Sequence, residues 1–382
     1  MNSPNSRLAA ALWCAGLAAF ATMYAPQGLL TQISRDADVD PAQAALLVSA
    51  ATLGLALSVL PWAWLSNRIG TSSAMRIAAA TTAITAIMVP WLPTFDTLLA
   101  GRFLHGVALG GIPALAMALL HNTATPQRVA AMAGSYVAAT SLGGLSGRLL
   151  VVPIADHIGW RAALFILGCV VAVLMAALIG LIPRPSADPA ESDNGAVLAH
   201  LRDPAMLSLF GIGALLIGGM VVVFNYLPFR LEEAPYRLAP TVVSLIFLAY
   251  LGGTAGSRAA GWLTDRVGGA PILASAGLLM AGGAALTLAR PVSMILLGLV
   301  VLTTGLFIGH AVASNMVAAR ANHGRAQATA MYNISYYAGS SAFGWFGGLA
   351  WLHAQWLAVA GLVIVLGLGA SVLSVRPAHA PA

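Results

Sequence analysis

The sequence predicts an all-helical membrane protein, with twelve transmembrane helices arranged as two equivalent bundles of six. The composition is the first reason, since 59% of the residues are hydrophobic and 8% are charged, whereas a soluble domain carries about 25% charged residues. The second reason is that the apolar residues form long runs, and a run of about 20 residues spans a bilayer as a helix. The third is an internal repeat, because residues 63–70 and 261–268 have similar sequences and divide the chain of 382 residues into two halves.

The predicted membrane helices follow the apolar runs in order. The first run could be taken for a signal peptide, but it continues through Tyr24, Pro26 and Gln27 without a small-x-small cleavage site, so we predict a membrane helix there. The twelve predicted spans are 8–30, 42–65, 74–92, 97–120, 129–153, 160–182, 205–229, 240–261, 270–289, 292–317, 326–349 and 355–374.

The repeat places the predicted domain boundaries. Residues 1–182 form the N-terminal six-helix bundle, 205–382 form the C-terminal one, and 183–204 form a cytoplasmic linker. Within this linker we predict a short interfacial helix over 195–201. A second pair of similar segments, 157–160 and 353–356, supports the same division.

The basic residues set the predicted orientation, because cytoplasmic loops of membrane proteins are enriched in arginine and lysine. All 18 basic residues are arginines. With the N-terminus in the cytoplasm, eleven of them face the cytoplasm and five face outside, while Arg102 and Arg148 lie inside helices. We therefore predict a multi-pass protein of the bacterial inner membrane with both termini cytoplasmic.

The same composition limits the partners. The net charge of +6 is explained by loops that face anionic headgroups, and no aromatic-basic cluster of the nucleic-acid-binding kind occurs. Cys14 and Cys169 both lie inside apolar runs, so neither a disulfide framework nor a metal site is expected. The expected partners are the lipid bilayer and a small-molecule substrate, with no cofactor and no nucleic acid.

The repeated octet resembles the loop between helices two and three of the major facilitator superfamily, roughly G-x-L-(A/S)-D-R-x-G. The second copy keeps Gly261, Asp265, Arg266 and Gly268, whereas the first has Ala63 for glycine and Asn67 for aspartate. Neither copy has the basic pair that follows the octet in the family, since residues 71–72 are Thr-Ser and residues 269–270 are Gly-Ala. The resemblance covers the whole chain. It implies the major facilitator fold, a substrate path between the two bundles, transport by alternating access, and a monomer.

The resemblance also implies a role for the octets as gating loops. Asp265 would face the N-terminus of the fifth helix, where the helix dipole favours negative charge, and Asn67 would face the eleventh helix without a charge. The alternative is that the arginines of the octets only set the topology. The implied gating residues are Asn67, Arg68, Gly70, Gly261, Asp265, Arg266 and Gly268.

The two arginines inside predicted helices are candidates for the substrate path, since charges at membrane depth are expensive and usually face a cavity. Arg102 matches the fourth-helix arginine of the family, and His105 shares its helix face. Arg148 follows Gly143 and Gly147, which resemble the glycine-rich fifth helix of the antiporter branch and would allow close packing at an interface. Either arginine could instead extend to the headgroups.

Polar side chains within the other predicted helices complete the candidate path. The eleventh helix carries phenols and an amide along one side, and together with the seventh helix it resembles a bacterial subgroup of arabinose or drug efflux permeases. Tyr226 could equally be an interfacial aromatic residue. The remaining candidate path residues are Tyr24, Gln27, Tyr136, Asn225, Tyr226, His310, Asn315, Tyr332, Asn333 and Tyr336.

The function predicted from these features is export of a small drug-like or sugar-like compound against protons. All twelve acidic residues fall in predicted loops or at helix ends, which weakens the antiport prediction and leaves His105, His310 or an edge carboxylate such as Asp36 as proton carriers. The alternative is uptake or exchange of an organic anion bound by Arg102 and Arg148. A membrane enzyme is disfavoured, because no catalytic or metal-ligating cluster occurs at membrane depth.

Overall fold

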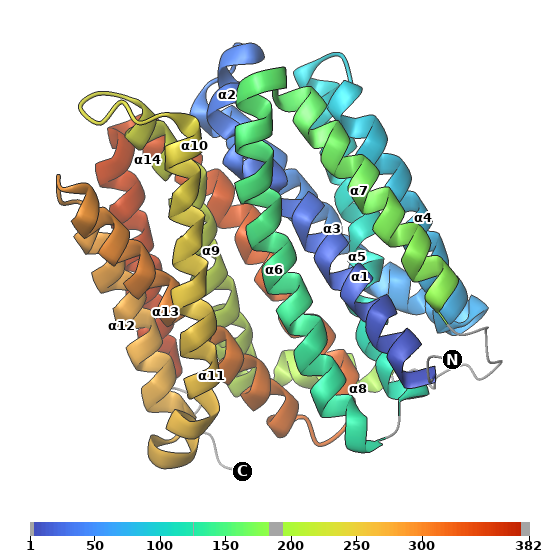
Figure 1. The fold of residues 1–382 in the computed structure, drawn as a ribbon. Helices are drawn as coiled ribbons and strands as arrows, with labels where there is room; N and C mark the ends of the chain where they lie inside the picture. Colours follow the sequence, from blue (N-terminus) through green and yellow to red (C-terminus); the bar gives the residue numbers. More distant parts are fainter. Residues whose placement is uncertain (1–3, 125, 183–193, 376–382) are drawn as a thin grey trace. The chain divides into compact units, whose positions relative to one another are not determined.

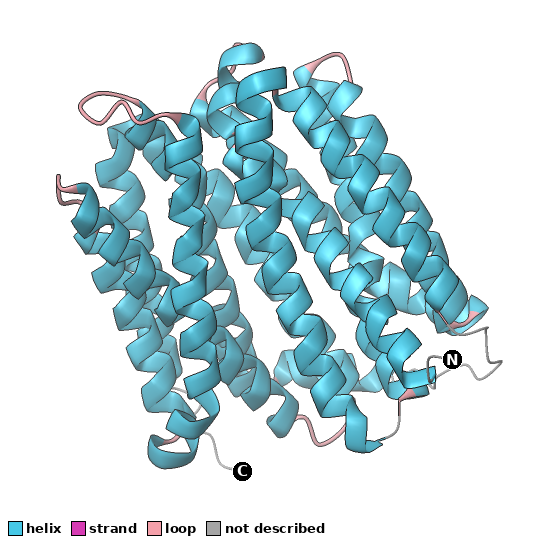
Figure 2. Ribbon diagram, viewed as in Figure 1, coloured by secondary structure: helices cyan, strands magenta, loops and turns pink. Residues whose placement is uncertain are grey.

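The computed structural model describes residues 4–124, 126–182 and 194–375, and within these ranges the chain is helical apart from short connections (Figures 1 and 2). No strand occurs in the described residues. The helices fall into two compact units, one of residues 1–39 and 50–192 and the other of residues 40–49 and 193–382.

In unit 1, the principal helix pairs are α1 with α6 and α4 with α7. Helix α3 contributes its first residues to unit 2 and the rest to unit 1. The elements are α1 (Pro4–Tyr24), η1 (Ala25–Gly28), α2 (Leu30–Asp36), α3 (Pro41–Ile69), α4 (Thr71–Met88), η2 (Val89–Trp91), α5 (Phe95–Thr123), α6 (Pro126–Ile158) and α7 (Trp160–Leu181).

In unit 2, α9 packs along α14, and α12 packs along α13. The elements are α8 (Asn194–Arg202), α9 (Pro204–Glu232), α10 (Pro240–Ser244), η3 (Leu245–Ala249), α11 (Tyr250–Val267), α12 (Gly269–Leu286), α13 (Val292–Arg320) and α14 (Arg325–Ser374).

The number of membrane spans agrees with the prediction. Eleven stretches in the described residues are long and apolar enough to cross a bilayer. The last of them, α14, is 50 residues long and is interrupted by non-helical backbone at Ala354 and Gln355, so it consists of two consecutive helices. The all-helical class and the twelve spans are therefore confirmed.

Two predicted spans are less regular than expected. The first changes at Tyr24 from α-helix to the short 3-10 turn η1, because Pro26 has no backbone N–H to continue the α-helical ladder. The span over 240–261 contains the 3-10 segment η3 between α10 and α11.

The helix predicted over 195–201 is confirmed as α8, and its position at the membrane interface stays a prediction. The rest of the predicted linker, up to residue 193, lies outside the described residues. The bundle boundaries at 182 and 205 and the cytoplasmic location of the termini stay predictions.

The repeat is visible in the backbone as four joints between consecutive helices. Three of the joints are single residues, and the fourth consists of Ala354 and Gln355. The three single residues are glycines with nearly the same geometry, with φ of 85° at Gly70 and 84° at both Gly159 and Gly268. The amide of Gly70 donates to Ser66 and its carbonyl accepts from Ala74, so this residue ends one helix and begins the next.

In the fourth joint, Gln355 has φ 48° and ψ −135°. It corresponds to Gly159 in the repeat at 157–160 and 353–356. Glycine adopts such backbone angles freely, whereas a residue with a side chain is destabilised there by about 1–3 kcal/mol. The second half of the protein thus carries strain at a position where the first half has none.

The repeated octets have the same local structure in both copies. The guanidinium of Arg68 lies 4.0 Å from the centre of the Trp64 ring, and that of Arg266 lies 3.9 Å from the centre of the Trp262 ring. Each pair is a cation–π contact across one helical turn. The contact of Asp265 or Asn67 with a helix start in the other half stays a prediction.

Gly143 and Gly147 allow α1 and α6 to approach each other closely within unit 1. A Cβ atom at Gly143 would lie 2.3 Å from the carbonyl oxygen of Leu17, and one at Gly147 would lie 2.3 Å from that of Ala21. Their predicted role at an interface between the two halves remains a prediction.

We expect Gly147→Val to lower the stability of the protein by about 3 kcal/mol, because the added carbons would force α1 away from α6. The melting temperature of the purified protein in detergent would measure this. Gly134→Val on the same helix is the control, since a Cβ at Gly134 would have no neighbour within 4 Å. Equal losses in the two variants would contradict the packing role of Gly147.

Asp203 fixes the start of α9 to the end of α13. Its carboxylate accepts a hydrogen bond from the Ala205 amide at 2.9 Å and another from Nε of Arg320 at 2.6 Å. Burial alone would raise the pKa of Asp203, but the hydrogen bonds from Arg320 and Ala205 outweigh it and hold the pKa below its usual value of 3.8.

A group whose pKa is lower in the folded state stabilises that state above its unfolded pKa. We therefore expect the contribution of Asp203 to be fully present above pH 3.8 and to be lost as the pH falls through the folded pKa. Asp203→Asn should lower the free energy of unfolding at neutral pH by about 1 kcal/mol and flatten the acid limb of the stability curve. Arg202→Gln, next to it in the chain, is the control, and an unchanged acid limb in Asp203→Asn would count against this ion pair.

Candidate functional site

The predicted site residues of unit 1 gather around the point where α1 ends. Gln27 lies in η1 and is fully buried, and Arg148 on α6 is 1% exposed. Nε of Arg148 donates to Oε1 of Gln27 at 2.7 Å, and one terminal nitrogen donates to the carbonyl of Gly144 at 2.6 Å. The guanidinium also lies 4.3 Å from the centre of the Tyr24 ring. Arg148 therefore stays at depth rather than extending to the headgroups, and none of these three partners carries a charge.

Arg102 on α5 contacts the last turn of α1. Its terminal nitrogens donate to the carbonyls of Met23 at 2.6 Å and Thr22 at 3.4 Å, and the side chain is 4% exposed. In an unbroken helix the Thr22 carbonyl would accept from the amide of residue 26, which is a proline and has no N–H. Arg102 supplies the missing donor, so its position is explained by the break in α1.

His105 is held by hydroxyl groups on both sides of its ring. Nδ1 lies 2.7 Å from Oγ1 of Thr85, and Nε2 lies 3.3 Å from Oγ1 of Thr22. The Thr85 hydroxyl also donates to the main-chain carbonyls of Thr81 and Thr82. Its single proton is therefore in use, and we assign the hydrogen of His105 to Nδ1. Both ring nitrogens of the neutral histidine are then satisfied.

Tyr136 on α6 is buried, and its hydroxyl has no hydrogen-bond partner among the described residues. Buried polar groups almost always have a partner. The hydroxyl of Tyr136 is thus a candidate contact for water or substrate in unit 1.

The predicted site residues of unit 2 gather around His310 on α13. Nδ1 of His310 lies 2.9 Å from the hydroxyl of Tyr332 on α14. The centre of the His310 ring lies 5.6 Å from that of Tyr332 and 4.6 Å from that of Tyr336. Gly213 on α9 makes room for this cluster, because a Cβ there would lie 2.7 Å from the Tyr332 ring.

The other predicted residues of unit 2 lie outside this cluster. Asn315 is exposed and Asn333 is half-buried, and neither is hydrogen-bonded to His310 among the described residues. Asn225 and Tyr226 are fully buried on α9, where the Tyr226 hydroxyl donates to the Gly344 carbonyl and its ring stacks on Trp351. Tyr226 therefore packs between α9 and α14, and its place on the substrate path stays a prediction.

Two features escaped the sequence reasoning. An aromatic cluster surrounds Tyr250, whose ring centre lies 5.0 Å from that of Phe224 and 5.8 Å from that of Phe307. A pocket opens where α9 ends, around Arg230 and Gln355. Residue types alone could not place the rings together, but the substitution of glycine by Gln355 in the repeat was a visible signal for the pocket.

The described residues hold no group of three or more metal-ligating side chains, and Cys14 and Cys169 are free thiols. The charged and hydrogen-bonding groups at membrane depth are thus the two arginines, two histidines and several phenols and amides described above. This set can bind a small molecule and exchange protons.

Comparisons with known proteins agree with this architecture. The family described as the Major Facilitator Superfamily matches residues 12–344. The chain is 34% identical to an uncharacterized transporter of this type, YybF of Bacillus subtilis, over 95% of this chain and 91% of the relative. It is 32% identical to the inner membrane transport protein YnfM of Escherichia coli, over 94% of this chain and 88% of the relative.

Solved structures show the same fold at low sequence identity. The nucleoside transporter NupG superposes with a TM-score of 0.78 at 12% identity, over 98% of this chain and 99% of the other. A D-xylose-proton symporter superposes with a TM-score of 0.78 at 15% identity, over 96% and 97% of the two chains. With the family match over most of its length, the chain belongs to the Major Facilitator Superfamily and is a multi-pass secondary transporter rather than an enzyme.

Proposed function

We propose that this transporter exports a small organic compound in exchange for protons, and that His310 carries the proton. The observation behind this proposal is the hydrogen bond between His310 and Tyr332. The resemblance to drug and arabinose efflux permeases, together with phenols and amides at membrane depth, supports a neutral or hydroxylated substrate.

The first observation in favour of a histidine as proton carrier is that no carboxylate lies inside the described spans. The acidic residues nearest to membrane depth, Asp96 and Asp156, lie in the first turn of α5 and the last turn of α6. Every other described acidic residue lies in a connection or in a terminal turn of a helix. A proton carried through the membrane part therefore needs a histidine, the side chain whose charge changes near neutral pH.

The second step is the choice between the two histidines. His105 is enclosed by two threonine hydroxyls and is 1% exposed, so a proton would have to displace an existing hydrogen bond. His310 is only half-buried, and its Nε2 makes no hydrogen bond among the described residues. His310 is therefore the more accessible proton acceptor.

The third step is the tolerance of the site for both charge states. The Tyr332 hydroxyl can donate to Nδ1 of neutral His310 or accept from Nδ1–H of the protonated form. The rings of Tyr332 and Tyr336 beside the imidazole can also stabilise a cation. The cluster thus supports a histidine that gains and loses a proton in each cycle.

We expect His310→Gln to abolish proton movement that depends on substrate, because glutamine keeps a polar side chain but cannot carry a proton. Liposomes containing the protein and an internal pH-sensitive dye would be challenged with chloramphenicol as a neutral, hydroxylated drug and arabinose as a sugar, with and without a proton gradient. Substrate-dependent proton movement in the wild type should fall to background in His310→Gln.

His353→Gln is the matched control, since His353 is exposed beside the joint in α14. It should leave proton movement unchanged. Substrate movement without any proton flux in the wild type would refute antiport. Full proton flux in His310→Gln would show that a group other than His310 carries the proton.

A second candidate function is exchange of organic anions at Arg148. Arg148 and Arg102 bring two positive charges to membrane depth, and both side chains are almost fully buried. The Arg148 guanidinium contacts the side chains of Gln27 and Tyr24, which can rearrange around a ligand. Such a site would attract a carboxylate or phosphate.

For this candidate we expect Arg148→Gln to slow benzoate counterflow by about tenfold, since a charge-assisted hydrogen bond is lost. Arg148→Lys should retain part of the rate, because it keeps the charge without the planar fork. Arg128→Gln, which removes an exposed arginine from the same helix, is the control for net charge. Equal rates in the wild type and Arg148→Gln would exclude Arg148 as the anion site.

A further inference from the structure

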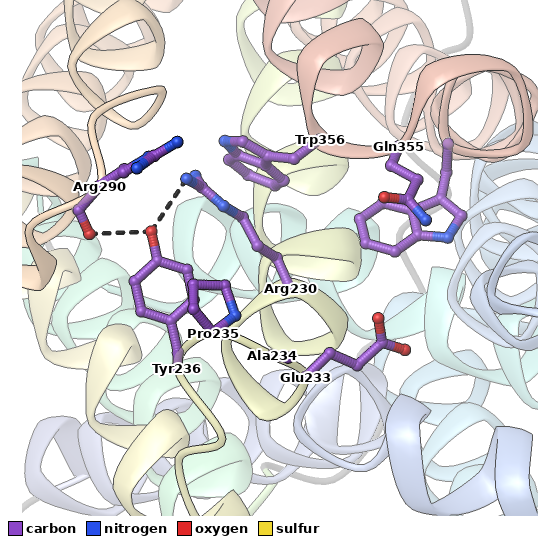
Figure 3. A pocket seen from close by; sticks show the side chains of 9 residues that line it. Arg230, Glu233, Ala234, Pro235, Tyr236, Arg290, Gln355 and Trp356 are labelled. Atoms are coloured by element: carbon purple, nitrogen blue, oxygen red, sulfur yellow. Dashed lines mark hydrogen bonds between the residues drawn. The ribbon is translucent and has the colours of Figure 1, made fainter.

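A cavity of about 550 Å³ lies in unit 2 at the end of α9 (Figure 3). Its lining comes from the connection after α9, the connection between α12 and α13, and the joint within α14. The lining residues are Arg230, Glu233, Ala234, Pro235, Tyr236, Arg290, Trp351, Gln355 and Trp356.

The charges around this cavity favour an anion. Arg230 is fixed by neutral groups, namely the main-chain carbonyls of Thr287 and Ala289 and the hydroxyl of Tyr236. Neither Arg230 nor Arg290 pairs with a carboxylate within the part of the chain that the structure describes. Glu233 lies across the cavity from Arg290 in Figure 3, so two positive charges face one negative charge.

The apolar walls of the cavity are rigid aromatic side chains. Nε1 of Trp356 donates to the Thr287 carbonyl at 3.1 Å, which fixes that indole. Trp351 packs against Tyr226 and Phe229, with ring centres 5.9 Å and 6.0 Å apart. Planar, immobile walls suit a ligand with a flat apolar body.

Gln355 is the least expected member of the lining. Its backbone has the strained geometry of the fourth joint, where the first half of the chain has Gly159. Nothing in the joint itself requires a side chain, as Gly159 shows. A strained residue at a cavity wall is an observation from which a function can be inferred, and here the side chain brings an amide into the cavity (Figure 3).

In the matching region of unit 1, the arginine lies beside a carboxylate that neutralises its charge. There, Nε1 of Trp160 donates to the carboxylate of Asp36 at 3.0 Å, and Nε of Arg161 lies 4.0 Å from the same carboxylate. The arginine of unit 1 therefore has an acidic partner that the arginines of the unit 2 cavity lack.

We propose that this cavity is a binding site for a small organic anion with a flat apolar body, such as an aromatic carboxylate. Arg290 and Arg230 attract the carboxylate, Trp351 and Trp356 enclose the ring, and the Gln355 amide hydrogen-bonds a polar group of the ligand. The site is separate from the cluster around His310, and it does not depend on the direction of transport or on proton coupling.

The experiment measures binding of para-fluorobenzoate to the purified protein in a neutral detergent, by fluorine NMR. Saturable binding should be about fivefold weaker in Arg290→Gln and unchanged in Arg237→Gln, which removes an exposed arginine of the connection after α9 that does not line the cavity. Glu233→Gln should tighten binding, because it removes a negative charge opposite the carboxylate.

Two variants at the joint separate binding from folding. Gln355→Gly should raise the melting temperature by releasing the backbone strain and at the same time weaken binding, whereas Gln355→Ala should weaken binding without raising the melting temperature. A purely structural role of Gln355 predicts unchanged affinity in both variants.

Several results would overturn the proposal. They are an absence of saturable binding in the millimolar range, equal weakening in Arg290→Gln and Arg237→Gln, and equally tight binding of the neutral para-fluorobenzyl alcohol. Unchanged affinity in Arg290→Gln would also overturn it and would direct attention to Arg148.

Discussion

Inside a bilayer, every main-chain carbonyl and amide needs a partner from the protein itself, and this requirement explains where three of the arginines lie. Arg102 donates to carbonyls left over where Pro26 breaks the first span. Arg161 donates to the carbonyls of Pro90 and Leu92 after α4, and Arg230 donates to those of Thr287 and Ala289 after α12. A planar guanidinium can reach two carbonyls at once, which a lysine ammonium does with less directional control. The use of arginine for every basic position in the chain fits this role.

The same requirement separates structural charge from functional charge. Arg102 was a natural candidate for the substrate path from its position in the sequence, but its contacts with α1 are what the broken helix needs. Arg148 differs, because one of its partners is the side chain of Gln27 and another is the ring of Tyr24. Side-chain partners can rearrange around a ligand more readily than the backbone of a helix. The two arginines therefore have similar depth and burial but different capacities for binding.

Much of the fold could be predicted from the sequence, because span length and the repeated octet are direct consequences of bilayer thickness and of duplication. The helix over 195–201 was also predicted. The candidate site was predictable only in part. The contact of His310 with Tyr332 joins α13 and α14, and the sequence pattern does not determine how these two helices are rotated relative to each other. The sequence also did not show whether Tyr226 faces lipid or packs against α14. The cavity at Gln355 depends on loop conformation, which composition does not determine. Gating by Asp265 and the division at residues 182 and 205 remain predictions.

The short joints between helices also bear on how the molecule can move. Gly70, Gly159 and Gly268 each separate two helices by a single residue, and the joint in α14 has two non-helical residues, Ala354 and Gln355. Two helices connected in this way cannot slide independently without breaking hydrogen bonds in a terminal turn. Each joined pair of helices should therefore move as one rigid body. The twelve spans then form eight bodies that can move independently, namely four joined pairs and four single helices. The longer connections between these bodies must supply the hinges.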